Sequence, residues 1–174
     1  QKSKPTAILI THSHHDHIRC ISEYIEAYPE IKVIGHPKSK LNDISEINYL
    51  PVNDNSTIKI GNLKIKTIHT PGHYFDSVCF LIENIIFTGD TLFIGRTGRT
   101  LNKGSNVYDL YNSVYTKLLT LPIDTIIYPG HNYGSKPTMT IKENIKISNL
   151  LQASGKKDFI DRMKKFELTR KKNS

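Results

Sequence analysis

The chain has 174 residues, and its 24 Lys and Arg against 16 Asp and Glu give a formal net charge of +8. This length suits one domain with its own hydrophobic core, and 37% hydrophobic with 23% charged residues is typical of a globular fold. No apolar run approaches the roughly 18 residues of a membrane-spanning helix, and the N-terminal residues show no signal-type stretch. We therefore expect a single domain over residues 1–174, located in the cytoplasm and without a membrane partner.

The positive charge is concentrated at the end of the chain. Residues 156–174 hold eight Lys and Arg against three Asp and Glu, so this basic C-terminal helix and tail carries five of the eight excess charges. A strongly basic chain would ordinarily favour nucleic acid as a partner. Because only three excess charges remain for the other residues, the distribution disfavours a nucleic-acid partner and favours a small-molecule substrate.

The pattern of apolar residues predicts strands and helices in alternation. A short apolar run at residues 7–10 is typical of a strand buried on both faces, and helical spacing predicts a helix over 18–28. Alternation around Gly61-Asn62 and around Glu83-Asn84 predicts two hairpins, whereas residues 38–50 show no clear periodicity. Further expected strands are 32–35 and 125–128, and further expected helices are 109–121, 138–151 and 157–166. This mixture predicts an α/β or α+β class in which helices cover the sheets.

The first strand ends in a segment dense in metal-binding residue types. Residues 11–17 read Thr-His-Ser-His-His-Asp-His, with four histidines and one aspartate. Packing explains this poorly, because neighbouring imidazoles repel one another when protonated, whereas a divalent cation uses them as ligands. A surface run of histidines is the alternative interpretation. Within the run, we expect His15 to point away from the other histidines.

Three further polar residues follow strand ends. His73 lies in Thr70-Pro71-Gly72-His73, Asp90 follows Thr88-Gly89, and His131 follows Pro129-Gly130. Side chains at the ends of core strands are held rigidly, and the neighbouring glycines allow the backbone to approach an ion closely. The sequence therefore predicts a metal site that is assembled from several strand ends.

Together these segments resemble the metallo-β-lactamase superfamily from about Ala7 to Tyr133. The HxHxDH motif of that family is matched by His12, His14, Asp16 and His17, and its later positions by His73, Asp90 and His131. The resemblance implies a four-layer αββα sandwich. Because that fold has several strands before the HxHxDH strand, we expect the chain to lack part of the N-terminal sheet.

Within the superfamily, three segments are similar to the branch that contains glyoxalase II (hydroxyacylglutathione hydrolase) and the persulfide dioxygenases. They are Phe87–Phe93, Gly98–Thr100 and Gly130–Tyr133. The resemblance implies one metal ion on His12, His14 and His73. It implies a second ion on Asp16, His17 and His131, with Asp90 as the bridge between the two. The expected ions are two divalent metals, with Zn as the first choice and Fe or Mn as alternatives.

The same resemblance implies roles for four residues. Asp16 and Asp90 are the expected catalytic residues, and Asp16 is both a ligand and a candidate proton acceptor. Arg99 and Tyr133 are the expected substrate-binding residues, because a guanidinium fork suits a carboxylate and a phenol can donate to a thioester or peptide oxygen.

The function expected from these residues is that of a metal-dependent hydrolase. It would cleave a glutathione-type or other small thioester through a metal-bound hydroxide. One alternative is a glutathione persulfide dioxygenase with a single Fe on His12, His73 and Asp90. Less favoured alternatives are a nuclease of the same superfamily and an incomplete, non-catalytic domain. The sequence leaves open whether the chain forms a homo-oligomer.

Overall fold

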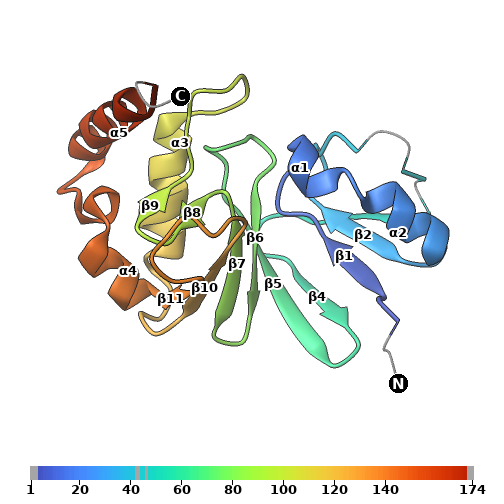
Figure 1. Cartoon of the computed structure of the whole chain (residues 1–174). Coiled ribbons are helices and arrows are strands. Elements are labelled where there is room, and N and C mark those ends of the chain that lie inside the picture. Colours follow the sequence, from blue (N-terminus) through green and yellow to red (C-terminus); the bar gives the residue numbers. More distant parts are fainter. Residues whose placement is uncertain (1–3, 42–43, 46, 172–174) are drawn as a thin grey trace.

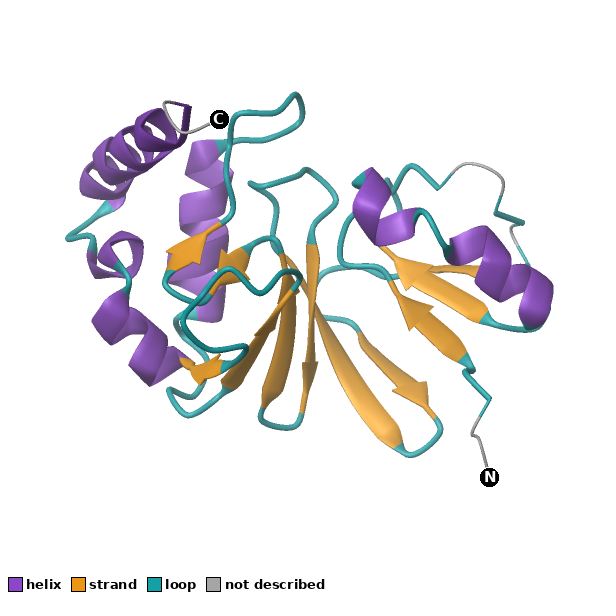
Figure 2. Cartoon of the chain, in the orientation of Figure 1, coloured by secondary structure: helices purple, strands orange, loops and turns teal. Residues whose placement is uncertain are grey.

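The structure is a computed structural model of the 174-residue chain, and it describes residues 4–41, 44–45 and 47–171. Its helices and strands form four layers, with two sheets between two groups of helices (Figures 1 and 2). Helices α1 and α2 cover one sheet, and α3, α4 and α5 cover the other. No helix among the described residues is both long and apolar enough to cross a membrane.

The smaller sheet and its helices come from the first part of the chain. The sheet has the order β1-β2-β3, and both of its strand pairs are parallel. The elements are β1 Ala7–Leu9, α1 His15–Ile18, α2 Ile21–Ala27, β2 Lys32–Gly35 and β3 Tyr49–Pro51. The strands predicted at 7–10 and 32–35 are confirmed. The helix predicted at 18–28 is confirmed as α2, which is shorter at both ends, and the separate helix α1 begins inside the histidine-rich segment.

The larger sheet has six strands in the order β11-β10-β7-β6-β5-β4. Both predicted hairpins are confirmed as the antiparallel pairs β4–β5 and β6–β7. Strands β8 and β9 form a separate two-stranded sheet. The strands are β4 Thr57–Ile60, β5 Leu63–His69, β6 Val78–Ile82, β7 Ile85–Gly89, β8 Leu92–Phe93, β9 Arg96–Thr97, β10 Ile126–Pro129 and β11 Met139–Thr140.

The helices of the C-terminal part cover the outer face of the larger sheet. They are α3 Val107–Asn112, the π-helical turn η1 Ser113–Leu118, α4 Ile141–Ile147, the 3-10 turn η2 Asn149–Gln152 and α5 Lys156–Lys171. The helix predicted at 138–151 is wrong at its start, because Met139–Thr140 pairs with β10 as a strand. Thr140 then caps α4 through a reciprocal pair of hydrogen bonds with Glu143.

Three hydrophobic clusters lie between the four layers. On β6, Phe80 faces the cluster between the two sheets, whereas Cys79 faces the cluster under α3, α4 and α5. A third cluster, which includes Ile10 and Val33, lies between the smaller sheet and its helices. Because successive strand residues point to opposite faces, each sheet buries both of its faces. The predicted α/β class and the four-layer αββα arrangement are therefore confirmed.

Candidate metal centre

The strand ends that carry the predicted ligands meet at one edge of the sandwich. Strands β5 and β7 are both antiparallel to β6, and β10 is parallel to β7, so β5, β7 and β10 end at the same edge. Strand β1 of the other sheet also ends there, since the backbone N–H of Val78 donates to the carbonyl of Thr11 at 2.7 Å. Each of these four strands is followed in the chain by a candidate ligand: β1 by His12, β5 by His73, β7 by Asp90 and β10 by His131. The topology therefore assembles residues that are far apart in the chain.

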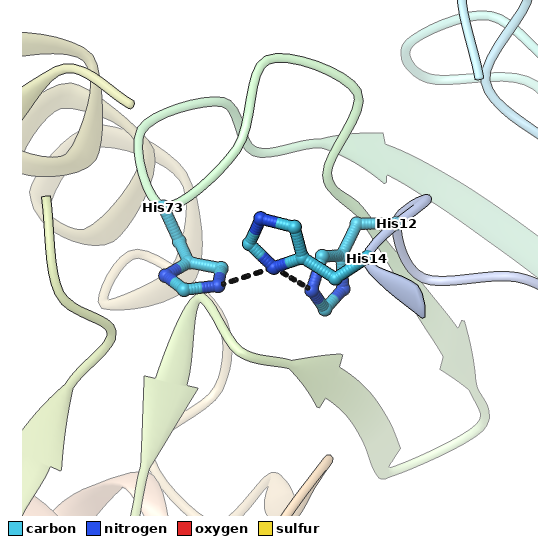
Figure 3. A group of neighbouring side chains, drawn as sticks. All are labelled: His12, His14 and His73. Atoms are coloured by element: carbon cyan, nitrogen blue, oxygen red, sulfur yellow. Dashed lines mark hydrogen bonds between the residues drawn. The ribbon is translucent and has the colours of Figure 1, made fainter. Parts of the chain in front are cut away.

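His12, His14 and His73 form the first group of candidate ligands. Nδ1 of His14 lies 2.9 Å from Nε2 of His12 and 3.1 Å from Nε2 of His73 (Figure 3). The other ring nitrogen of His73, Nδ1, donates to the backbone carbonyl of Arg99 at 2.9 Å. This contact orients the ring and leaves Nε2 facing the group, as in many metal-binding histidines.

Asp16, His17 and His131 form the second group. Oδ2 of Asp16 lies 3.2 Å from Nε2 of His131 and 3.7 Å from Nε2 of His17. One ligand atom from each of the three lies within 4.8 Å of the other two, which is also true of the first group. His15 is exposed and belongs to no such group among the described residues, as expected.

Asp90 lies between the two groups. Its Oδ1 is 3.4 Å from Nε2 of His17, and its Oδ2 is 3.6 Å from Nε2 of His73 and from Nε2 of His131. Asp90 thus contacts one histidine of the first group and two of the second. This is the position that a carboxylate bridge between two ions requires.

The electrostatics keep three of these histidines neutral. Burial lowers the pKa of His12 to about 2, and burial also lowers the pKa of His14 and His73. Burial acts on His17 in the same direction, but its contact with Asp90 outweighs burial and raises the pKa of His17. A neutral imidazole has a free lone pair on one ring nitrogen, so the first group is ready to bind a cation.

Two buried polar atoms indicate that a cation fits between these groups. Nε2 of His17 and Oδ1 of Asp90 are buried, and apart from their mutual ion-pair contact at 3.4 Å neither atom has a hydrogen bond among the described residues. An unpaired buried polar group costs about 1–3 kcal/mol, and coordination to an ion would satisfy both atoms. Imidazole nitrogens with carboxylate oxygens are the donor set of zinc, and iron and manganese bind similar sets.

Two glycines allow the close packing around Asp90. A Cβ atom at Gly130 would lie 2.5 Å from Oδ1 of Asp90 and 2.9 Å from Cε1 of His17. A Cβ atom at Gly98 would lie 1.9 Å from the backbone oxygen of Asp90 and 3.0 Å from the His73 side chain. These positions tolerate no side chain without displacing a candidate ligand.

A small cavity of about 40 Å³ lies beside His73 and Asp90, and both predicted substrate-binding residues, Arg99 and Tyr133, line it. Arg96, which the sequence analysis missed, lines it as well. The guanidinium of Arg96 lies 4.3 Å from the centroid of the Tyr133 ring. The signal in the sequence was the repeated Gly-Arg-Thr at 95–97 and 98–100.

Two buried acids that hydrogen-bond to segments next to the site, Asp76 and Glu167, were also not predicted from the sequence. Oδ2 of Asp76 accepts a hydrogen bond from the backbone N–H of Ser13 at 3.0 Å, inside the histidine-rich segment. Oε1 of Glu167, in α5, accepts one from the backbone N–H of Thr100 at 2.6 Å. Glu167 carried no signal in the sequence, because it lies in a segment that reads as a solvated basic helix.

Four layers with seven clustered His and Asp side chains at the strand ends define an αββα protein with a candidate dinuclear metal centre. The chain belongs to the metallo-beta-lactamase superfamily, whose family model matches residues 1–131. This match confirms the resemblance drawn from the HxHxDH motif and the later turns.

Three relatives illustrate the similarity. BaeB of Bacillus velezensis, a probable polyketide biosynthesis zinc-dependent hydrolase, is 29% identical over 156 residues, which cover 90% of this chain and 69% of that protein. A hydroxyacylglutathione hydrolase of Tolumonas auensis is 35% identical over 127 residues, which cover 73% of this chain and 48% of that protein. The crystal structure of ETHE1 from Myxococcus xanthus has a TM-score of 0.79 and 31% identity, covering 91% of this chain and 68% of that chain. The chain thus spans about half the length of the hydroxyacylglutathione hydrolases that it matches.

Proposed function

We propose that the chain is a metal-dependent hydrolase that cleaves a glutathione-type or other small thioester. The observation that carries the proposal is the arrangement of six candidate ligands in two groups of three, with Asp90 between the groups as the seventh. When bound, two divalent ions would lower the pKa of a water molecule toward neutral and polarise a thioester carbonyl. The names of the relatives, among them a zinc-dependent hydrolase and several hydroxyacylglutathione hydrolases, support this class of reaction.

The residues of the chain have distinct roles in this proposal. His12, His14 and His73 would hold one ion, and Asp16, His17 and His131 would hold the other. Asp90 would be the ligand that the two ions share. The Asp16 side chain is 55% exposed, so Oδ2 of Asp16 can accept a proton at the site and release it to solvent. Asp90 is the more buried of the two carboxylates, with a side chain that is 12% exposed, which suits a fixed bridge.

Arg99 and Tyr133 would bind the substrate beside this centre. Both side chains are exposed and both line the cavity next to His73 and Asp90. The Arg99 guanidinium can bind a carboxylate in a bidentate fashion, and the Tyr133 hydroxyl can donate to a carbonyl oxygen. A cytoplasmic small thioester such as a glutathione conjugate offers both groups.

Metal content and turnover measured on the same preparation test the proposal. We expect elemental analysis to give about two divalent ions per chain. We also expect cleavage of an S-acylglutathione, lost after chelation and restored by zinc. One iron per chain with oxygen uptake on glutathione persulfide, and no thioester cleavage, would contradict the proposal.

The second candidate is the persulfide dioxygenase with one iron on His12, His73 and Asp90. The likeness to ETHE1 favours it, and Nε2 of His73 lies 3.6 Å from Oδ2 of Asp90. Within residues 4–41, 44–45 and 47–171, however, these three side chains do not form one of the compact groups that could hold an ion. A compact group of two histidines and one carboxylate is formed instead by His12, His17 and Asp90. The preference for the hydrolase therefore rests on the further group of Asp16, His17 and His131, which a single iron on His12, His73 and Asp90 would leave unused.

A further inference from the structure

The three histidines of the first ligand group come from two segments that lie against each other. Residues 12–14 follow β1, and residues 73–76 belong to the turn between β5 and β6. Nε2 of His73 lies 3.1 Å from Nδ1 of His14 (Figure 3), and the ring centroid of Tyr74 lies 4.3 Å from that of His14. The spacing of the three ligands therefore depends on what joins these two segments.

A buried carboxylate, that of Asp76, joins the two segments. Asp76 is 0% exposed, and its Oδ2 accepts a hydrogen bond from the backbone N–H of Ser13 at 3.0 Å. Ser13 stands in the chain between two ligands of the group, His12 and His14, and Asp76 follows the third ligand, His73, by three residues. One side chain therefore connects the backbone between two ligands to the turn that carries the third.

The charge of Asp76 is not needed for this hydrogen bond. Its other oxygen, Oδ1, is buried without a hydrogen-bond partner, and Asp76 forms no ion pair, in both cases among the described residues. A neutral amide would accept the same N–H, whereas a buried charge without a partner is costly. Burial lowers the pKa of His14, and the negative charge of Asp76 acts on that ring in the opposite direction. The carboxylate thus places a negative charge close to three ligands that are neutral.

We propose that Asp76 is a positioning residue that sets the affinity of the three-histidine group for its metal ion. This inference rests on the metal centre of the proposed function and is independent of its substrate. The hydrogen bond to Ser13 fixes the backbone between His12 and His14, so the two rings keep their spacing before an ion is bound. The negative charge of Asp76 favours a divalent cation in the group, and such a cation supplies the positive charge that this buried carboxylate otherwise lacks.

Two substitutions of Asp76 separate the hydrogen bond from the charge. Zinc affinity is measured on the metal-free chain by competition with a chromophoric chelator. Asp76→Asn keeps an oxygen acceptor and removes the charge, so we expect one zinc-binding step to weaken about tenfold. Asp76→Ala removes both, and we expect the same step to weaken about a hundredfold. This should be the step that His14→Ala weakens, and not the step that His131→Ala weakens.

Two control variants change groups close to this contact. Asp54→Asn is the matched control, because Oδ1 of Asp54 also accepts a backbone N–H, that of His69 at 2.8 Å, but outside the residues 12–14 and 73–76. Ser13→Ala is the second control, because the contact uses the backbone N–H of Ser13, which alanine retains. Both controls should bind zinc as the parent does. Zinc affinities of Asp76→Asn and Asp76→Ala equal to that of the parent would overturn the proposal.

Urea unfolding of the metal-free chain distinguishes positioning from a purely structural role. If Asp76→Asn unfolds more easily than the parent but binds zinc equally well, the role is purely structural and the proposal is wrong. Should the Asp76 variants fail to fold, hydrogen exchange of the metal-free parent gives the test. We expect slow exchange of the Ser13 N–H, because its acceptor is fully buried. Exchange as fast as that of an exposed, unbonded N–H would contradict the proposal.

Turnover of an S-acylglutathione by the same preparations keeps this inference apart from the proposed function. If Asp76→Asn weakens zinc binding and the zinc-loaded parent cleaves no thioester, the role of Asp76 stands and the hydrolase proposal fails. If the parent cleaves the thioester and the Asp76 variants bind zinc as tightly as the parent, the role of Asp76 is wrong and the hydrolase proposal stands.

Discussion

Glu167 of α5 holds Thr100 through two hydrogen bonds, with Oε1 of Glu167 2.6 Å from the backbone nitrogen and 3.0 Å from Oγ1 of Thr100. The preceding residue, Arg99, presents its carbonyl to Nδ1 of His73. Helix α5 therefore supports the orientation of a candidate metal ligand through a short chain of contacts. Glu167 is 9% exposed, so these contacts are shielded from solvent.

This relationship predicts the effect of Glu167→Ala. The substitution leaves the Thr100 N–H and hydroxyl without their acceptor, so we expect a loss of about 1–3 kcal/mol in the free energy of unfolding. Urea unfolding measures that loss, and elemental analysis should show weaker metal retention. Glu167→Gln, which keeps an oxygen acceptor at this position, is the control and should preserve most of both properties. Equal stability of the Ala variant and the parent would contradict the supporting role of Glu167.

A second prediction concerns Asp90. Because it contacts both ligand groups, Asp90→Ala should remove most of the bound metal and reduce thioester cleavage by at least about a hundredfold, a loss of the size seen when a key electrostatic group is removed. Elemental analysis and turnover measure the two effects. Asp124→Ala is the matched control and should change neither, because Asp124 is an exposed acid that precedes β10, at the end of the strand opposite His131. Full metal content in the Asp90 variant would show that Asp90 is no bridge.

Gly130 gives a test that changes no ligand. In Gly130→Ala the added methyl group would meet Oδ1 of Asp90 and Cε1 of His17, so we expect reduced metal content and reduced activity. Gly155→Ala adds the same methyl group at a position where a Cβ has no neighbour within 4 Å, and it should behave like the parent. The prediction is wrong if the two variants bind metal equally well.

The contacts of Asp54 lead us to expect that the free energy of unfolding depends on pH. Burial would raise the pKa of its carboxyl, but Nζ of Lys117 at 2.7 Å and the backbone N–H of His69 at 2.8 Å outweigh burial and lower the pKa. A lowered folded-state pKa means that the charged carboxylate stabilises the fold above the ordinary Asp value of 3.8. This stabilisation is lost as the pH falls through the lowered pKa.

The variant Asp54→Asn measures this contribution. At pH 7 it should unfold more easily than the parent by about 1 kcal/mol or less, because both partners of the ion pair are partly exposed and screened by solvent. The difference between the two proteins should narrow when urea unfolding is repeated at pH 3 and below. Asp124→Asn, at an exposed acid with no ion pair to a described residue, should show no such change. A difference that grows toward low pH would contradict the assigned direction of the shift.

Most of the local elements and all seven candidate ligands were predictable from the order of residues in the chain. The two hairpins follow from alternating apolar residues around Gly61-Asn62 and Glu83-Asn84, because a strand with two different faces repeats every two residues. His12, His14, Asp16 and His17 were recognisable because they lie within six residues of one another. His73, Asp90 and His131 were recognisable because each follows a predicted strand and a glycine. These signals depend on residues that are near neighbours in the chain, so they can be recognised without a structure.

The three-dimensional packing was needed to show which of these residues lie close to one another. Strands β8, β9 and β11 have two residues each, too few to show a period, and they exist only because they pair with distant segments. The separation of six side chains into two groups, with Asp90 between them, depends on the common direction of β5, β7 and β10. The contact of Glu167 with Thr100 and the contact of Arg96 with Tyr133 each join segments dozens of residues apart. No local periodicity encodes such contacts, since they arise from the packing of whole layers against one another.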